Sequence, residues 1–248
     1  MKFSVTPYDL PLVVPFTTAH ATVARRRGLL VALADDNHIG YGEVAPMPGW
    51  TPIGVEQANA MLRRAIATVE EGRDFAEVLD ELETAPEVRA GLSGAAADLA
   101  AHRQGLPLAR SLDADSLETV AVNAVVGFGS VRQTVDAGLD AIQRGFSVIK
   151  MKVGVAAPDI DIERVAMMRT AVGTNVELRL DANGAWDAPT AQRVLESIAV
   201  FGIAFCEEPV AGIDAIAELG VTSPIPLAID ESARTVEDVA RALGTGSI

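Results

Sequence analysis

Two lysines and three carboxylates stand out because their spacing could bring them to one place. Lys150 and Lys152 lie two residues apart in an apolar run, and Asp181, Glu207 and Asp230 follow at successive intervals of 29, 26 and 23 residues, counted from Lys152. Each interval is about the length of one strand plus one helix. Because lysine can lose its proton when its surroundings lower its pKa, whereas arginine cannot, the lysine pair could serve as a general base.

The scarcity of lysine strengthens this interpretation. The chain has 17 arginines but only three lysines, of which the third is Lys2. Lys150 and Lys152 are at i and i+2 of a predicted strand, so both side chains would point to the same face. Repulsion between the two ammonium groups, together with a nearby metal ion, would lower the pKa of at least one. The alternative is two ordinary surface lysines on an exposed strand, which fits their apolar neighbours less well.

Short apolar strands that alternate with amphipathic helices must position these side chains. The predicted strands cover residues 120–126, 147–153, 176–181, 203–207 and 227–230, and the predicted helices cover residues 130–144, 158–172, 188–200, 213–219 and 236–243. This alternation indicates a parallel sheet. In a closed barrel the carboxyl ends of the strands meet at one rim, whereas an open sheet spreads them along a line. The sequence therefore predicts an α/β fold of the (β/α)8 TIM-barrel type.

Three carboxylates aimed at one point cannot all stay ionised without a counter-charge. A divalent cation with oxygen ligands supplies it, and Mg²⁺ is the first choice, with Mn²⁺ as a possible substitute. The alternative is that each acid caps the helix that follows, which Asp181 and Asp230 could do separately. The three acids are spaced in register with the lysine pair, which favours a shared metal site over three separate helix caps. A base beside a metal that holds a carboxylate suits removal of the proton on the adjacent carbon.

The first part of the chain differs from the barrel region and predicts an α+β capping domain over residues 1–115, before a barrel domain over 116–248. Strands are expected at 3–6, 28–33 and 38–44, a loop at 45–52, and helices at 55–71 and 87–103. The small residues at 90–97 predict close helix packing rather than a phosphate loop, because no glycine pattern follows a strand there.

Charge and composition exclude several classes of partner. The formal net charge is −14, which argues against binding to nucleic acid. No apolar stretch is as long as a membrane span, and no secretory signal is visible. The single cysteine, Cys206, excludes an internal disulfide and fits a reducing compartment. We expect a cytoplasmic enzyme that acts on a small-molecule carboxylate.

Four motifs resemble those of the enolase superfamily, in its muconate-lactonizing subgroup. They are Lys150-Met151-Lys152, residues 180–186 (LDANGAW), residues 206–209 (CEEP) and residues 229–232 (IDES). The resemblance implies that Lys152 is the base and that Lys150 supports it and the substrate carboxylate. It also implies a metal site and a set of surrounding groups. The implied Mg²⁺ ligands are Asp181, Glu207 and Asp230, and the implied surrounding groups are Asn183, Glu208 and Ser232.

The loop after the third predicted strand narrows the resemblance. Residues 40–51 (GYGEVAPMPGWT) are most similar to the o-succinylbenzoate synthase family, which implies a carbon–oxygen lyase (dehydratase) of menaquinone biosynthesis. That reaction dehydrates a cyclohexadiene carboxylate, SHCHC. Trp50 would contact the substrate, although it could equally be a packing residue. A dipeptide epimerase, an N-acylamino acid racemase or a cycloisomerase shares the same lysines and acids, so these activities remain open.

Two further expectations come from the resemblance. Arg25-Arg26-Arg27 lies where the family has a mobile loop, and it is expected to form a solvated turn, with one arginine as the alternative contact for the anionic succinyl tail. The barrel is expected to be incomplete at its C-terminus, with strands 1–5 but without the sixth-strand lysine of the family. Such a chain would have little or no activity, or would be a non-catalytic remnant. The family commonly assembles, so a homo-oligomer is also expected.

Overall fold

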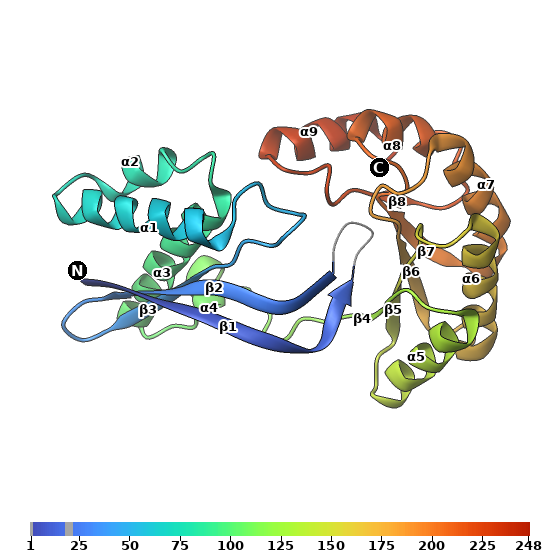
Figure 1. The fold of residues 1–248 in the computed structure, drawn as a ribbon, viewed down its shortest axis with the longest axis horizontal. Helices are drawn as coiled ribbons and strands as arrows, with labels where there is room; N and C mark the ends of the chain where they lie inside the picture. The colour runs from blue at the N-terminus through green and yellow to red at the C-terminus, as the bar shows by residue number, and fades with distance from the viewer. Residues whose placement is uncertain (1, 18–21) are drawn as a thin grey trace. The chain divides into compact units, whose positions relative to one another are not determined.

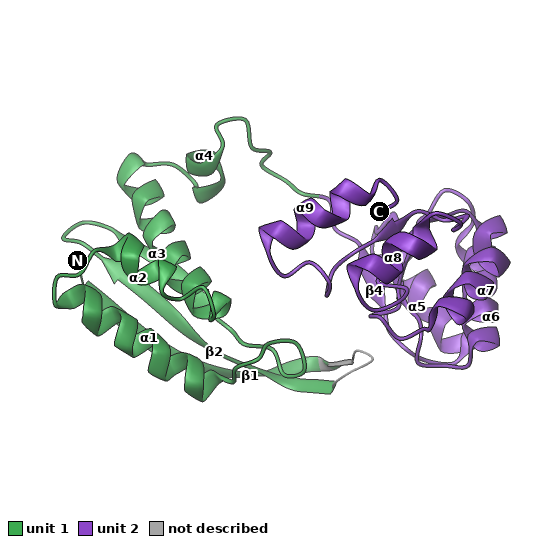
Figure 2. Ribbon diagram, turned by 90° about the horizontal axis from the view of Figure 1, so that it is seen from above, with its two compact units in different colours: residues 1–16, 21–120 green, residues 17–20, 121–248 purple. Residues whose placement is uncertain are grey.

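A computed structural model of the chain describes residues 2–17 and 22–248, shown in Figure 1. The chain divides into two compact units, shown in Figure 2. The first holds residues 1–16 and 21–120, and the second holds residues 17–20 and 121–248. In the described part of the chain, no helix combines the length and apolar character that a membrane crossing requires.

The first unit is a three-stranded sheet with helices packed on one face. Its strands lie in the order β1 (Lys2–Thr17), β2 (Thr22–Ala34) and β3 (Ile39–Val44), and β2 pairs antiparallel with β3. Its helices are α1 (Val55–Glu70), α2 (Phe75–Asp80), α3 (Pro86–Gln104) and α4 (Leu108–Leu112). Alternate residues of β2, namely Leu29, Val31 and Leu33, are buried in the same apolar cluster as helix residues such as Leu62 and Leu92. This period of two is what a sheet with one covered face requires.

Helix α3 packs on β3 with the two backbones almost in contact. A Cβ atom added at Gly42 would lie 2.0 Å from the carbonyl oxygen of Gly91, and one added at Gly40 would lie 2.2 Å from the backbone nitrogen of Leu99. Only glycine leaves room for such an approach. The close helix packing predicted from the small residues at 90–97 is confirmed.

The second unit is a parallel sheet whose five strands lie side by side in chain order. They are β4 (Ala124–Val126), β5 (Val148–Lys152), β6 (Glu177–Asp181), β7 (Ile203–Glu207) and β8 (Leu227–Ala228). The helices are α5 (Val131–Gln143), α6 (Pro158–Val172), α7 (Ala188–Ile198), α8 (Ile213–Gly220) and α9 (Val236–Thr245), with the 3-10 turn η1 (Ala199–Phe201). Figure 1 shows α5 to α8 along one face of the sheet. This is the arrangement of a (β/α)8-type barrel with an N-terminal α+β cap, as predicted.

The strands of the second unit present opposite faces with different chemistry. On β5, Ile149 and Met151 are fully buried in the apolar core, and Leu178 and Leu180 of β6 belong to the same core. Lys150 and Lys152 alternate with these residues and therefore point to the other face. The alternation predicted from the sequence around the lysine pair is present in the structure.

Several predicted boundaries are wrong. Strand β1 is much longer than the predicted 3–6, and β2 begins at Thr22, so Arg25, Arg26 and Arg27 lie on a strand and not in a solvated turn. The reason is pairing with β1, where Asp9 accepts from Arg25 Nε at 2.7 Å. Helices α2 and α4 were not predicted. Strand β8 ends at Ala228, so Asp230 lies in the loop after the strand and not within it.

Candidate active site

The lysine pair and two of the predicted metal ligands meet at the carboxyl ends of β5, β6 and β7. Lys152 pairs in register with Asp181, and Asp181 pairs with Glu207. Lys152 Nζ lies 2.5 Å from Asp181 Oδ2, and Lys150 Nζ lies 2.8 Å from the same oxygen and 2.7 Å from Glu207 Oε1. The structure thus brings these four side chains into one hydrogen-bonded cluster.

The cluster shifts the acidity of its members in opposite directions. Burial would raise the pKa of Asp181, but hydrogen bonds from Lys150 and Lys152 outweigh it and hold that pKa below its usual value. Burial raises the pKa of Glu207 to about 7, and the negative charges of Asp181 and Asp230 add to the effect against the bond from Lys150. Glu207 therefore lies close enough to Asp181 and Asp230 for their charges to act on it.

Lys150 is bound by two carboxylates. Burial tends to lower its pKa, but its hydrogen bonds to Asp181 and Glu207 outweigh burial, so the pKa is raised. The lowered pKa predicted for at least one of the two lysines assumed a metal ion beside the pair, and it stays a prediction.

Glu208 holds the loop that carries the third predicted ligand. This side chain is buried, and its Oε1 accepts from the backbone nitrogens of Asp230 and Ser232, each at 2.7 Å. Ser232 Oγ donates to Glu208 Oε2 at 3.0 Å. Glu208 itself has a φ of 42°, a conformation that costs energy in a residue with a side chain. Glu208 and Ser232 therefore fix the backbone of Asp230 next to Glu207.

Asn183 connects Lys152 to Glu231, a residue that was not predicted from the sequence. Its Oδ1 accepts from Lys152 Nζ at 3.0 Å, and its Nδ2 donates to Glu231 Oε1 at 2.7 Å. Among the described residues, no group donates to the buried Oε2 atom of Glu231. Burial is the main reason that the pKa of Glu231 is raised. Its position directly after Asp230 in the IDES motif was the only signal in the sequence.

The three predicted ligands offer carboxylate oxygens, the type of donor that suits a divalent cation. Asp181 and Glu207 lie at the ends of neighbouring strands, and Asp230 follows the next strand. After burial, the charges of Asp181 and Asp230 contribute to the raised pKa of Glu207. Oxygen donors of this type suit Mg²⁺. Within residues 2–17 and 22–248, no three His, Cys, Asp or Glu side chains are already gathered as metal ligands. The ammonium groups of Lys150 and Lys152 also form ion pairs with these acids, Lys150 with Asp181 and Glu207 and Lys152 with Asp181.

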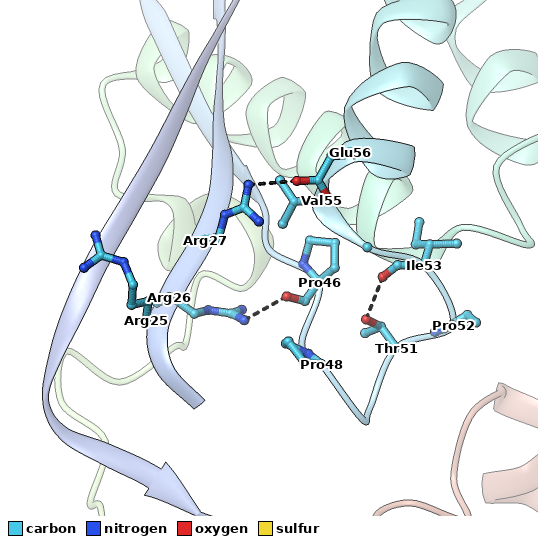
Figure 3. Close-up of a pocket in the computed structure, with 11 residues that line it drawn as sticks. Arg25, Arg26, Arg27, Pro46, Pro48, Thr51, Pro52, Ile53, Val55 and Glu56 are labelled. Carbon is cyan, nitrogen blue, oxygen red and sulfur yellow. Dashed lines mark hydrogen bonds and ion pairs between the residues drawn. The ribbon is translucent and has the colours of Figure 1, made fainter. Parts of the chain in front are cut away.

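The first unit contains a cavity of about 300 Å³ between β2 and the loop that precedes α1, shown in Figure 3. Arg25, Arg26 and Arg27 line one side of it, and residues between 46 and 56 line the other. Arg25 pairs with Asp9, and Arg27 Nη2 pairs with Glu56 at 2.8 Å.

Arg26 is bound differently from its two neighbours. Its guanidinium donates to the backbone carbonyl oxygens of Ala45 at 2.6 Å and Pro46 at 3.1 Å. A carbonyl oxygen carries no formal charge, so these bonds orient the cation without neutralising it. Trp50 lies in the turn at the edge of the same loop, where its backbone nitrogen donates to Met47. The predicted contact of Trp50 with substrate stays a prediction.

Comparisons with known proteins identify the family. The family model described as enolase C-terminal domain-like matches residues 133–248, and the model of the MenC N-terminal domain matches residues 2–99. The chain belongs to the enolase superfamily. Among members of the superfamily, an o-succinylbenzoate synthase from Thermosynechococcus vestitus is 29% identical over 99% of this chain and 73% of its own length.

Members with another activity are equally similar. A hydrophobic dipeptide epimerase from Enterococcus faecalis is 28% identical over 94% of this chain and 68% of its own length. The solved structure of the dipeptide epimerase from Enterococcus faecalis V583, complexed with Mg and the dipeptide L-Leu-L-Tyr, aligns with a TM-score of 0.90 at 24% identity. The alignment covers 99% of this chain and 72% of that chain. The fold of this superfamily member is therefore that of a solved relative with bound Mg.

Proposed function

We propose that this superfamily member removes a proton from the carbon next to a carboxylate in a Mg²⁺-dependent reaction. The observation that carries the proposal is the meeting of Lys150, Lys152, Asp181 and Glu207 at the ends of three neighbouring strands. Few arrangements of side chains combine a buried amine with acids that could hold a divalent cation. The strand ends of a barrel are also where such enzymes have their active sites.

Each side chain has a proposed role. Lys152, the more buried lysine, takes the proton and is oriented by Asn183 and Asp181. Lys150 supports Lys152 and binds the substrate carboxylate. Asp181, Glu207 and Asp230 would hold Mg²⁺, with Glu208 and Ser232 fixing the loop of Asp230. When bound, Mg²⁺ supplies positive charge where negative charge develops on the carboxylate.

Within this reaction class we propose o-succinylbenzoate synthase activity, the dehydration of SHCHC in menaquinone biosynthesis. The match of residues 2–99 to the MenC N-terminal domain supports this choice. Of Arg25, Arg26 and Arg27, we propose Arg26 as the contact for the succinyl carboxylate, because its guanidinium donates to uncharged carbonyl oxygens. Dipeptide epimerisation is the second candidate, since an epimerase is as similar in sequence as a synthase.

A substrate panel separates the two candidates. The purified 248-residue chain with Mg²⁺ is tested on SHCHC and on a set of dipeptides. Conversion of SHCHC into an equal amount of o-succinylbenzoate supports the synthase. Exchange of the α-proton of a dipeptide supports the epimerase. Turnover of neither class, with Mg²⁺ still bound, would contradict both candidates. A homo-oligomer and a cytoplasmic location also remain proposals.

Arg26→Gln tests the role of the cavity in this choice. For the synthase, the variant is expected to raise the KM for SHCHC about tenfold while kcat changes little, because a lost ion pair weakens binding of ground state and transition state alike. Arg25→Gln is the matched control, since Arg25 is already paired with Asp9. An equal rise in KM in both variants would remove Arg26 from the proposed substrate contact.

A further inference from the structure

An arginine and an aspartate of helix α6 form a fully buried ion pair. Arg164 and Asp161 are both 0% exposed, and Arg164 Nη1 lies 2.8 Å from Asp161 Oδ1. Arg164 also donates to Thr134 Oγ1 at 2.9 Å from Nε, and to the carbonyl oxygen of Gly127 at 2.9 Å from Nη2. A buried pair of this kind contributes little net stability, because two charges must leave water. Its presence calls for a reason other than stability.

The reason lies in what the pair holds. Arg164 Nη1 donates to the backbone carbonyl oxygen of Lys152 at 3.0 Å. Asp161 Oδ2 accepts from the backbone nitrogen of Gly154 at 2.8 Å, and Gly154 has a φ of 95°. The two side chains therefore bind the main chain on both sides of Val153, at the residue of the proposed base and at the turn that follows β5.

We propose that the Arg164–Asp161 pair is a positioning element for Lys152. By fixing the carbonyl group of Lys152 and the turn at Gly154, it determines where β5 ends and how the lysine side chain leaves the strand. The ammonium group then meets Asp181 Oδ2 at 2.5 Å and Asn183 Oδ1 at 3.0 Å. The position of Lys152 depends on the structure alone, whereas its effect on turnover rests on the proposed function.

The same helix provides a matched control. Arg169 also uses its guanidinium to bind backbone carbonyl groups, those of Val176 at 2.7 Å and Gly202 at 2.9 Å. These residues precede β6 and β7, so Arg169 acts at the opposite ends of the strands from Lys152. Loss of either arginine removes several hydrogen bonds to the barrel, but only Arg164 touches the backbone of the proposed base.

The three lysines of the chain make the test direct. With ¹³C-labelled lysine, the full chain gives Cε signals from Lys2, Lys150 and Lys152 alone, which the variants Lys2→Arg and Lys150→Arg assign. Arg164→Gln is expected to move or broaden the Lys152 signal and to leave Lys2 unchanged. Arg169→Gln is expected to leave the Lys152 signal in place. An unchanged Lys152 signal in Arg164→Gln, or an equal change in Arg169→Gln, would overturn the proposal.

Milder variants keep the test decisive if Arg164→Gln does not fold. Thr134→Val removes one acceptor of Arg164, and Asp161→Asn weakens the hold on Arg164 and Gly154 together. Both are expected to shift the Lys152 signal in the same direction, with the larger shift for Asp161→Asn. Folded variants with the wild-type Lys152 signal would overturn the proposal.

Turnover gives a second readout that mere loss of stability would not reproduce. With the substrate found for the wild-type chain, Thr134→Val and Asp161→Asn are expected to lower kcat with little change in KM, by about tenfold for Asp161→Asn. Arg169→Gln is expected to keep kcat when assayed below its melting temperature. If the wild-type chain turns over no substrate, the proposed function fails, whereas the lysine signals still decide the positioning role.

Discussion

The two units of the chain differ in how many polar and charged side chains they bury. All the buried polar or charged side chains found among the described residues lie in the second unit, and they are Thr134, Lys152, Asp161, Arg164, Asp181, Asn183 and Glu208. In the first unit, ion pairs such as Arg73 with Glu81 and Arg103 with Asp35 lie at the surface. Even a paired charge must leave water when it is buried, at a cost that its partner offsets only in part. The second unit therefore carries a cost in stability that chemistry at the ends of its strands can explain.

The largest expected effect concerns the proposed base. Lys152→Met should lower kcat by about 10²–10⁴-fold on whichever substrate the wild-type chain accepts, because it removes the group that takes the proton. Lys150→Met should lower it less, and Lys2→Met, in the first unit, should not change it. Steady-state kinetics at saturating Mg²⁺ checks this order. A Lys152→Met variant with near-normal kcat would assign the buried lysine to structure alone.

An intermediate effect concerns pH. The pKa of Glu207 is raised to about 7 from an ordinary value of 4.5, so between these pH values the folded chain keeps a proton that the unfolded chain has released. The contribution of Glu207 to the free energy of unfolding is therefore fully present below pH 4.5 and is lost as the pH rises through 7, with a loss on the order of 2 kcal/mol between pH 5 and pH 7.5. Urea unfolding at pH 5 and pH 7.5 without Mg²⁺ measures it.

Glu207→Gln provides the comparison for the pH experiment. Because glutamine does not titrate, the variant should lose less stability than the wild-type chain between pH 5 and pH 7.5. Groups remote from the cluster titrate equally in both chains, so their contributions cancel in the difference, and the remainder comes from Glu207 and the groups that it touches. The same loss in both chains would show that Glu207 is ionised throughout this range.

The smallest expected effect lies at the surface of the first unit. Arg73 pairs with Glu81 at 2.8 Å and with Glu77 at 3.5 Å, and all three side chains are well exposed. Exposed pairs of this kind are screened by water and salt, so Arg73→Gln should leave the melting temperature without measurable change. Thermal unfolding at low and high salt checks this. A drop as large as that of a buried-pair variant such as Asp161→Asn would remove the contrast between the units.

The sequence predicted the second unit better than the first. The repeat of strand and helix, and the alternation around Lys150 and Lys152, depend on local periodicity that survives in any fold. Helices α1 and α3 were predicted for the same reason, within one residue at each end for α3. The extent of β1 and β2 depends on pairing between them, which a single strand does not reveal. The boundary between the capping domain and the barrel domain, between residues 115 and 116, stays a prediction.

Parts of the site were beyond the sequence for a physical reason. Asp161 and Arg164 are three residues apart on a helix, a spacing that is typical of ordinary surface ion pairs. Only the packing of α6 on the sheet buries them and aims them at Lys152 and Gly154. The raised pKa of Lys150 likewise depends on distances to two carboxylates that follow it by 31 and 57 residues.

The central claim is that the acids and lysines at the strand ends form one cation-dependent site. A Mg²⁺ titration of the ¹³C-lysine-labelled chain tests it directly, because Lys150 and Lys152 lie in that cluster and Lys2 lies in the first unit. We predict saturable shifts of the Lys150 and Lys152 signals, absent in Asp181→Asn, with Lys2 unmoved. Signals that do not respond to Mg²⁺, or that respond equally for all three lysines, would contradict the account.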